Sequence, residues 1–226
     1  MIYRNLHLLG TSHIAKESVQ AVEREITAIR PAAIALELDP GRLAGLLGKR
    51  QRMRMRDVFH VGIKGFLFAL IGAWAERKLG KVVGISPGAE MLAAVQLARE
   101  QQIPLHLIDQ DIAVTLRKIS REFSWRERWR LFVDIVLAPF RGKSMLQKYQ
   151  IDLRKVPAEQ AIVRLLADVK SRYPNLYRVL ITERNAVMAH RLSRLMSQHP
   201  QQGILGIVGA GHVTDIITRI QAMHKI

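Results

Sequence analysis

Two short segments near opposite ends of the chain share one pattern, and that pattern limits the folds that the chain can adopt. Residues 8–13 are LLGTSH and residues 207–212 are IVGAGH, so an apolar run is followed by glycine, two small residues and histidine. An apolar run that ends at glycine indicates a buried strand, after which small residues allow a sharp turn. We therefore expect each histidine just beyond the carboxyl end of a strand, where open α/β sheets bind ligands.

Two further predicted strands end in carboxylates. Residues 33–39 are apolar until Glu37, and residues 103–109 lead through a largely apolar run to Asp109, with Asp111 two positions later. If all four strands belong to one parallel sheet, their polar ends share one edge. The residues expected at that edge are His13, Glu37, Asp109, Asp111 and His212.

Histidine and carboxylate side chains suit a borderline divalent ion such as zinc, manganese or cobalt. Each residue also has a structural interpretation when it is taken singly. A histidine after a strand often bonds to loop backbone, and an acid at that position often caps the next helix. Asp111 is a candidate for such a cap, because apolar residues at helical spacing follow it.

The composition favours one α/β domain in a reducing compartment. The chain has 226 residues, enough for a single domain over residues 1–226 with a substantial core. It contains no cysteine, which excludes disulfides, cysteine nucleophiles and thiolate metal sites. The first residues lead directly into a strand, so no signal peptide is visible. We expect a cytoplasmic protein, with association to a membrane as an open alternative.

The chain carries a large excess of positive charge. Its formal net charge is +16, from 35 basic and 19 acidic residues, and residues 49–56 (KRQRMRMR) are the densest basic cluster. Such an excess favours anionic partners. A solvated helix face is nevertheless the preferred interpretation of the cluster, and no nucleic-acid-binding motif accompanies it. Nucleic acid is therefore not an expected partner.

Two helical insertions into the sheet fold are predicted, at residues 45–80 and 111–156. The first contains an apolar segment, residues 61–75, that is too short to span a bilayer. Burial or a dimer contact is the preferred interpretation, and a helix lying on a membrane surface is the alternative. In the second insertion, Ser124 and Glu127 match a capping box. We expect a helical hairpin that forms a homodimer or covers the ligand crevice.

The segment 174–198 predicts a long helix with one buried stripe. At about 100° per residue, Arg184 and Asn185 fall inside the apolar stripe, while Glu183 lies off its edge. A buried arginine is costly unless it is paired, and the strand-end carboxylates are its natural partners. The expected ion pair has two interpretations, a structural brace or an organiser of a substrate site.

Six segments, in order along the chain, together resemble the TraB/PrgY family of pheromone shutdown proteins. Its superfamily includes the Tiki and GumN proteins and the erythromycin-esterase (EreA)/ChaN-like fold. The matching pieces are residues 10–13 (GTSH), 36–39 (LELD) with Arg42, 87–91 (PGAEM), 109–111 (DQD), 183–185 (ERN) with Met188 and Ala189, and 209–213 (GAGHV). The resemblance implies an α/β fold with a mostly parallel central sheet, flanking helices and a helical insertion subdomain.

The resemblance also implies a metal-dependent, peptidase-like hydrolase. In that mechanism His13, Glu37 and His212 hold one divalent ion, which lowers the pKa of bound water. A nearby acid, Glu90 or Glu183, takes the proton as general base.

In the same mechanism, the remaining site residues contact the substrate. Arg184 or Arg42 stabilises the oxyanion, and Asn185 orients a ligand or the substrate carbonyl. The chain departs from the family at Ala15, where members often carry a small hydroxyl residue. Many bacterial members also carry a membrane-spanning region after this domain, whereas this sequence ends at Ile226.

Two rival functions belong to other classes. The same crevice could hold a peptide or an anion without turnover, as a regulatory binding module. A basic adaptor on a membrane surface or nucleic acid would instead depend on charge and weaken with salt. The partners expected from the sequence are a peptide or other small anionic substrate, a second copy of the chain and a peripheral membrane contact.

Overall fold

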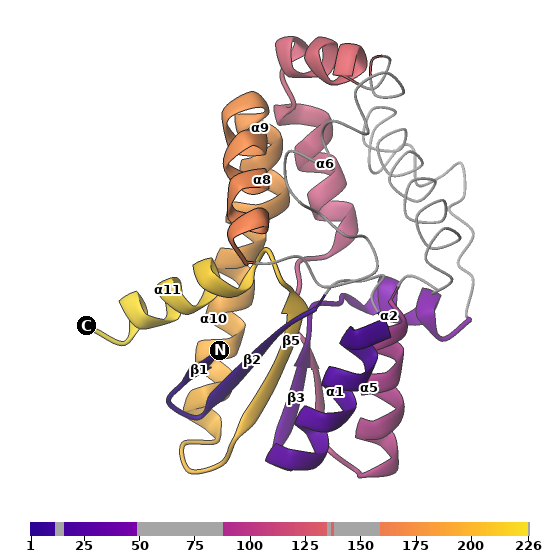
Figure 1. The fold of residues 1–226 in the computed structure, drawn as a ribbon, viewed down its shortest axis with the longest axis vertical. Coiled ribbons are helices and arrows are strands. Elements are labelled where there is room, and N and C mark those ends of the chain that lie inside the picture. The colour runs from indigo at the N-terminus through magenta and orange to yellow at the C-terminus, as the bar shows by residue number, and fades with distance from the viewer. Residues whose placement is uncertain (12–15, 49–87, 135–136, 138–158, 226) are drawn as a thin grey trace.

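The structure is a computed structural model that describes residues 1–11, 16–48, 88–134, 137 and 159–225. Its central feature is a five-stranded sheet with the strand order β1-β2-β5-β3-β4 (Figure 1). The strands are β1 (Ile2–Tyr3), β2 (Leu6–Thr11), β3 (Ala33–Leu36), β4 (Leu105–Leu107) and β5 (Ile204–Gly209). Only the β1–β2 pair is antiparallel, so the predicted α/β fold with a mostly parallel sheet is confirmed.

The first and last long strands, β2 and β5, are direct neighbours. They pair in parallel over their full length, from Leu6 opposite Ile204 to Thr11 opposite Gly209. All six residues of β5 are buried, as expected for a central parallel strand covered on both faces. The chain therefore brings the strand ends at Thr11 and Gly209 to one edge of the sheet. Gly10 is needed there, because a Cβ atom on it would lie 3.1 Å from Cα of Ala210.

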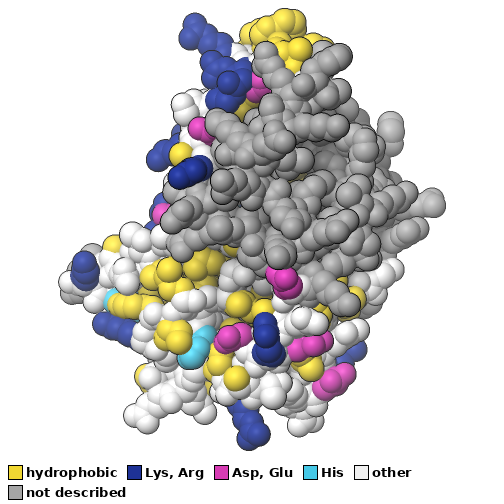
Figure 2. All heavy atoms as spheres, viewed as in Figure 1, with side chains coloured by type: hydrophobic (Ala, Val, Ile, Leu, Met, Phe, Trp, Pro, Cys, Tyr) yellow, Lys and Arg dark blue, Asp and Glu magenta, His cyan; other side chains and the backbone are white. Residues whose placement is uncertain are grey.

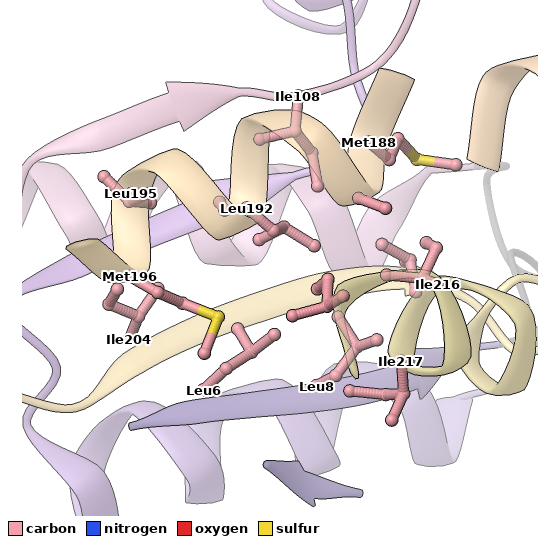
Figure 3. Packing of buried hydrophobic residues seen from close by; sticks show 14 of the residues in the cluster. Leu6, Leu8, Ile108, Met188, Leu192, Leu195, Met196, Ile204, Ile216 and Ile217 are labelled. Atoms are coloured by element: carbon pink, nitrogen blue, oxygen red, sulfur yellow. The ribbon is translucent and has the colours of Figure 1, made fainter. Parts of the chain in front are cut away.

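Helices cover both faces of the sheet. On one face α1 (Lys16–Ile29) and α5 (Ala89–Glu100) pack on alternate strand residues, which include Leu36, Leu205 and Ile207. On the other face α10 (Glu183–Gln198) and α11 (Val213–Met223) pack on the intervening residues. Figure 3 shows this second layer, in which Leu192 of α10 lies over β2 and β5 beside Leu8.

A helical extension continues beyond the carboxyl edge of the sheet (Figure 1). Its helices are α6 (Ile112–Glu122), residues 125–134, α8 (Glu159–Arg172) and α9 (Pro174–Tyr177). Their apolar side chains form a separate cluster that includes Leu116, Phe123 and Leu176. The predicted capping box is confirmed, because Glu127 N donates to Ser124 Oγ at 3.3 Å and Ser124 N donates back to Glu127 Oε2 at 3.1 Å.

The helical segment predicted at 174–198 is interrupted by a π-helical turn. It begins as α9, continues as the π-helix η1 (Arg178–Thr182) and ends as α10. A π turn accommodates an extra residue and often occurs at functional sites. Here it directly precedes Arg184 and Asn185, the two polar residues that the periodicity places in the buried stripe.

Most of the first predicted insertion lies outside the described residues, including the basic cluster 49–56 and the apolar segment 61–75. The described part of the second insertion, from residue 111 to 134, is largely helical. Within the described part of the chain, no helix is both long and apolar enough to cross a membrane.

Leu192 offers a test of the packing between α10 and the sheet. It is fully buried, so Leu192→Ala should lower the free energy of unfolding by about 2–5 kcal/mol. Leu47→Ala is the matched control, because Leu47 is 41% exposed and its truncation should cost less than about 0.5 kcal/mol. Chemical denaturation of both variants measures the difference, and equal costs would contradict the layer arrangement described above.

Candidate functional site

Glu37 lies at the carboxyl edge of the sheet, directly after β3. Its backbone N–H donates to Ile207 O at 3.0 Å, which extends the pairing of β3 with β5 by one residue. Its carboxylate turns toward the end of β5, where Oε2 accepts from Gly209 N at 2.6 Å. The residue is 4% exposed, so this carboxylate is buried at the junction of two strands.

His212 approaches the same carboxylate from the start of α11. Its Nε2 lies 3.3 Å from Glu37 Oε1, and its Nδ1 lies 2.5 Å from Asn185 Oδ1. Asn185 is fully buried, and its Nδ2 donates to Asp215 Oδ2 at 2.7 Å. The Asn185 oxygen is therefore the acceptor for His212, and His212 Nδ1 carries a proton. This network holds the imidazole ring with Nε2 toward Glu37.

Arg184 joins two strand-end carboxylates from the first turn of α10. Its guanidinium donates to both oxygens of Asp109, with Nε–Oδ1 at 3.0 Å and Nη2–Oδ2 at 2.6 Å. Nη2 also donates to Glu37 Oε1, and Nη1 donates to Leu180 O at 3.0 Å. The side chain is only 13% exposed, so the buried ion pair predicted from the helix stripe is present.

A second arginine also binds the carboxylate of Asp109. Arg42 Nη2 donates to Asp109 Oδ2, while Arg42 Nε donates to Asp39 Oδ2 at 2.6 Å. Asp39 is the N-cap of α2 (Pro40–Leu46), since its Oδ1 accepts from Gly41 N at 2.8 Å. The cap therefore positions Arg42 as well as starting the helix. Arg42 is 33% exposed and is the more accessible of the two arginines.

The ion pairs keep these groups charged despite their burial. Burial alone would raise the pKa of Asp109, but hydrogen bonds and charge from Arg184, with those from Arg42, outweigh burial and lower the pKa. Burial alone would lower the pKa of Arg184, yet its contacts with Asp109 and Glu37 raise the pKa above the usual arginine value. Both arginines and Asp109 therefore remain ionised across the physiological range.

The structure places the other predicted site residues differently. Glu90 is buried in the first turn of α5, at the end of that helix where Gly88 packs against Leu46 of α2. Glu183 points away to the helical extension, where Lys118 Nζ lies 2.5 Å from its Oε2. Asp111 is exposed and caps α6, because its Oδ1 accepts from Ala113 N at 2.6 Å.

Three side chains of the network are absent from the sequence-based set. Asp39 positions Arg42 through their ion pair. Asp215 orients Asn185, and it follows His212 by three residues. Arg191 Nη1 donates to the main-chain oxygen of Asp109 at 2.6 Å, and it follows Arg184 by seven residues. Both spacings place residues on one helix face, so helical periodicity counted from His212 and Arg184 was the signal that could have found them.

Two of the three predicted metal ligands lie together among the described residues. The imidazole of His212 faces the carboxylate of Glu37, and Asn185 orients the imidazole through its other ring nitrogen, as hydrogen-bond partners do for metal-bound histidines. Across the ranges that the structure describes, no group of three or more His, Asp or Glu side chains is close enough to hold an ion. The third predicted ligand, His13, lies outside the described residues. The donor chemistry thus fits a divalent ion, with two of the three expected ligands in view.

Comparison with known proteins gives one family. The model of the TraB/PrgY/gumN family matches residues 3–224. An uncharacterized protein of Methanocaldococcus jannaschii is 30% identical over 98% of this chain and 54% of its own length. TraB domain-containing proteins of Bos taurus and Homo sapiens are 20% and 21% identical over 93% of this chain and 61% of theirs. The chain thus spans between half and two thirds of these relatives.

Arg184 should be the most costly ion-pair residue to remove. Arg184→Ala leaves Glu37 and Asp109 buried with less compensating charge, and we expect a loss of about 3–5 kcal/mol in unfolding free energy. The matched control is Arg178→Ala, because Arg178 is 50% exposed and pairs with Glu122 on the surface. That substitution should cost less than about 1 kcal/mol. Similar melting of the two variants would contradict a buried brace.

The lowered pKa of Asp109 predicts a specific pH dependence. A carboxylate whose pKa is lower in the folded than in the unfolded chain stabilises the fold at high pH. Its contribution is complete above the unfolded value of about 3.9 and is lost as the pH falls through the folded value. The stability difference between the native chain and Asp109→Asn should therefore be largest at neutral pH and shrink in acid. Urea titrations at several pH values measure this difference in unfolding free energy, with Glu122→Gln as the surface control.

Proposed function

The chain belongs to the TraB/PrgY/gumN family, and we propose from its site that it is a hydrolase centred on Glu37 and His212. One observation carries the proposal: His212 Nε2 lies 3.3 Å from Glu37 Oε1, while Asn185 holds Nδ1. An imidazole fixed through one nitrogen and facing a buried carboxylate with the other suits metal binding or proton transfer.

In this proposal Glu37, His212 and His13 would hold a divalent zinc, manganese or cobalt ion. When bound, the ion would lower the pKa of water toward neutrality. The ligand types are those that such borderline ions prefer. Gly209 N–H fixes the second oxygen of Glu37, while Oε1 accepts from Arg184 Nη2 and faces His212 Nε2.

Residues of the chain would orient the ligand groups and transfer the proton in this proposal. The hydrogen bond from His212 Nδ1 to Asn185 keeps the ring in the tautomer that leaves Nε2 unprotonated and able to bind the ion. The general base of this proposal is one of the two acids that the sequence offers, Glu90 or Glu183, and Glu183 would have to leave its ion pair with Lys118 to serve. Glu90 is buried in α5 at the end that packs near α2.

The two arginines are suited to different roles. Arg184 makes four hydrogen bonds to Asp109, Glu37 and Leu180, so it organises the carboxylates. Arg42 is 33% exposed and is the guanidinium that we propose contacts the oxyanion or an anionic group of the substrate. A peptide or another small anionic molecule is the substrate class that follows from this charge.

Metal content and turnover together test the proposal. We expect protein purified without chelator to hold a divalent ion and to hydrolyse members of a peptide library when zinc, manganese or cobalt is present. Glu37→Gln and His212→Ala should lose both properties. The matched controls Glu122→Gln and His224→Ala change the same residue types at positions paired with Arg178 and Ser193, and should retain them.

Asn185 gives an independent, graded test. Removing the partner of a metal-bound histidine costs about 10–100-fold in metal affinity, so Asn185→Ala should bind the ion that much more weakly. Elemental analysis and competition with a chelator measure the change. An ion retained without turnover would instead support the regulatory binding module, and protein with no ion before or after reconstitution would refute the metal site.

A further inference from the structure

The helix formed by residues 125–134 carries a row of exposed aromatic side chains. Trp125, Trp129 and Phe132 are 75%, 60% and 57% exposed, and their spacing of four and three residues places them along one face. The rings of Trp129 and Phe132 stack with centroids 5.7 Å apart. We call these three residues the aromatic face. In Figure 1 this helix lies at the end of the extension farthest from the sheet.

The acidic side chains of this helix form hydrogen bonds and ion pairs with other residues of the protein. Glu127 is 4% exposed and accepts hydrogen bonds from Ser124 and from Asn175 N at 2.8 Å. Asp134 pairs with Arg172, with Nη2 of that arginine 2.6 Å from Oδ2. These contacts connect the helix that carries the aromatic face to α8 and α9.

The charge that surrounds the aromatic face is positive. Arg126 and Arg130 are exposed on the same helix, and Arg130 Nη1 donates to Arg172 O at 2.7 Å. A pocket of about 520 Å³ opens between the helix and the end of α8, lined by Arg126, Trp129, Arg130, Val133, Asp134 and Arg172. Figure 2 shows hydrophobic side chains gathered at this end of the molecule, with Lys and Arg side chains beside them.

We propose that the aromatic face docks the protein onto an anionic lipid surface. Trp and Phe side chains would enter the interfacial region, where amphipathic aromatic rings are favoured. Arg126 and Arg130 would contact lipid phosphates, with the pocket beside Trp129 accepting a headgroup. The net charge of +16 adds a general attraction to such a surface.

The size of the patch favours lipid over a protein partner. A stable protein interface needs roughly 20–30 residues on each side, whereas the aromatic face has three large side chains on one helix. Binding to a bilayer requires no surface of complementary shape. It is strengthened when inserted apolar side chains are combined with basic charge. This inference does not depend on the proposed hydrolase activity.

Vesicle flotation of the full chain tests the docking. We expect binding to phosphatidylcholine vesicles that contain phosphatidylserine, little binding to phosphatidylcholine alone, and loss of binding at high salt. Trp125→Ser with Trp129→Ser should abolish binding, and these exposed positions can change without disturbing the core. Each of Arg126→Gln and Arg130→Gln should weaken partitioning about fivefold.

Matched controls separate this face from the general basic surface. Arg99→Gln removes the same charge from an exposed site on α5, and Met223→Ala removes an exposed apolar side chain from α11. Neither substitution should change vesicle partitioning by more than about a tenth of the change expected for Trp125→Ser with Trp129→Ser. Tryptophan emission should shift to the blue on vesicle addition, and the shift should vanish when Trp125 and Trp129 are both replaced by Phe.

Three outcomes would overturn the inference. If the aromatic substitutions leave vesicle binding unchanged, that binding is due to the general charge of the chain and not to the aromatic face. An absence of binding to phosphatidylserine vesicles would remove the lipid surface as the partner. Light scattering that shows a dimer in the native chain, and a monomer after Trp125→Ser with Trp129→Ser, would assign the face to self-association.

Discussion

The buried ion pair between Arg184 and Asp109 is the interaction on which the site depends. It connects the first turn of α10 to Asp109, two residues after the end of β4, and through Nη2 it also reaches Glu37 after β3. Charges in this position are costly unless each is hydrogen-bonded to its partner, and here both oxygens of Asp109 are used. Any shift of α10 along the sheet would expose an uncompensated carboxylate, so the pair sets the register between helix and strands.

A second network shares Glu37 with the first. Asp215 orients Asn185, Asn185 orients His212, and His212 faces the Glu37 oxygen that also accepts from Arg184. Glu37 is thus the residue at which the ion pair and the imidazole network meet. The consequence is a site whose polar groups are positioned by each other and by strand ends, rather than by a long mobile loop.

Sequence patterns predicted the elements well and the side-chain partners less well. The paired glycine–histidine segments predicted neighbouring strands, and β2 and β5 are neighbours. The apolar stripe predicted a buried Arg184 with a carboxylate partner, and that pair is present. The periodicity did not reveal the π turn at 178–182, because an extra residue there leaves the apolar spacing on both sides readable as one helix. The direction of Glu183 toward Lys118 was equally inaccessible, since it depends on where α6 lies.

The sequence by itself determined the fold class, the strand ends that carry Glu37, Asp109 and the glycine before His212, and the helix face that carries Arg184. These are local properties, because apolar periodicity and glycine act within a few residues of one element. Only the tertiary structure decided that Asn185 meets His212 and that two arginines share Asp109. Such pairings join elements distant in sequence, so they depend on strand order and helix packing, which no local pattern specifies.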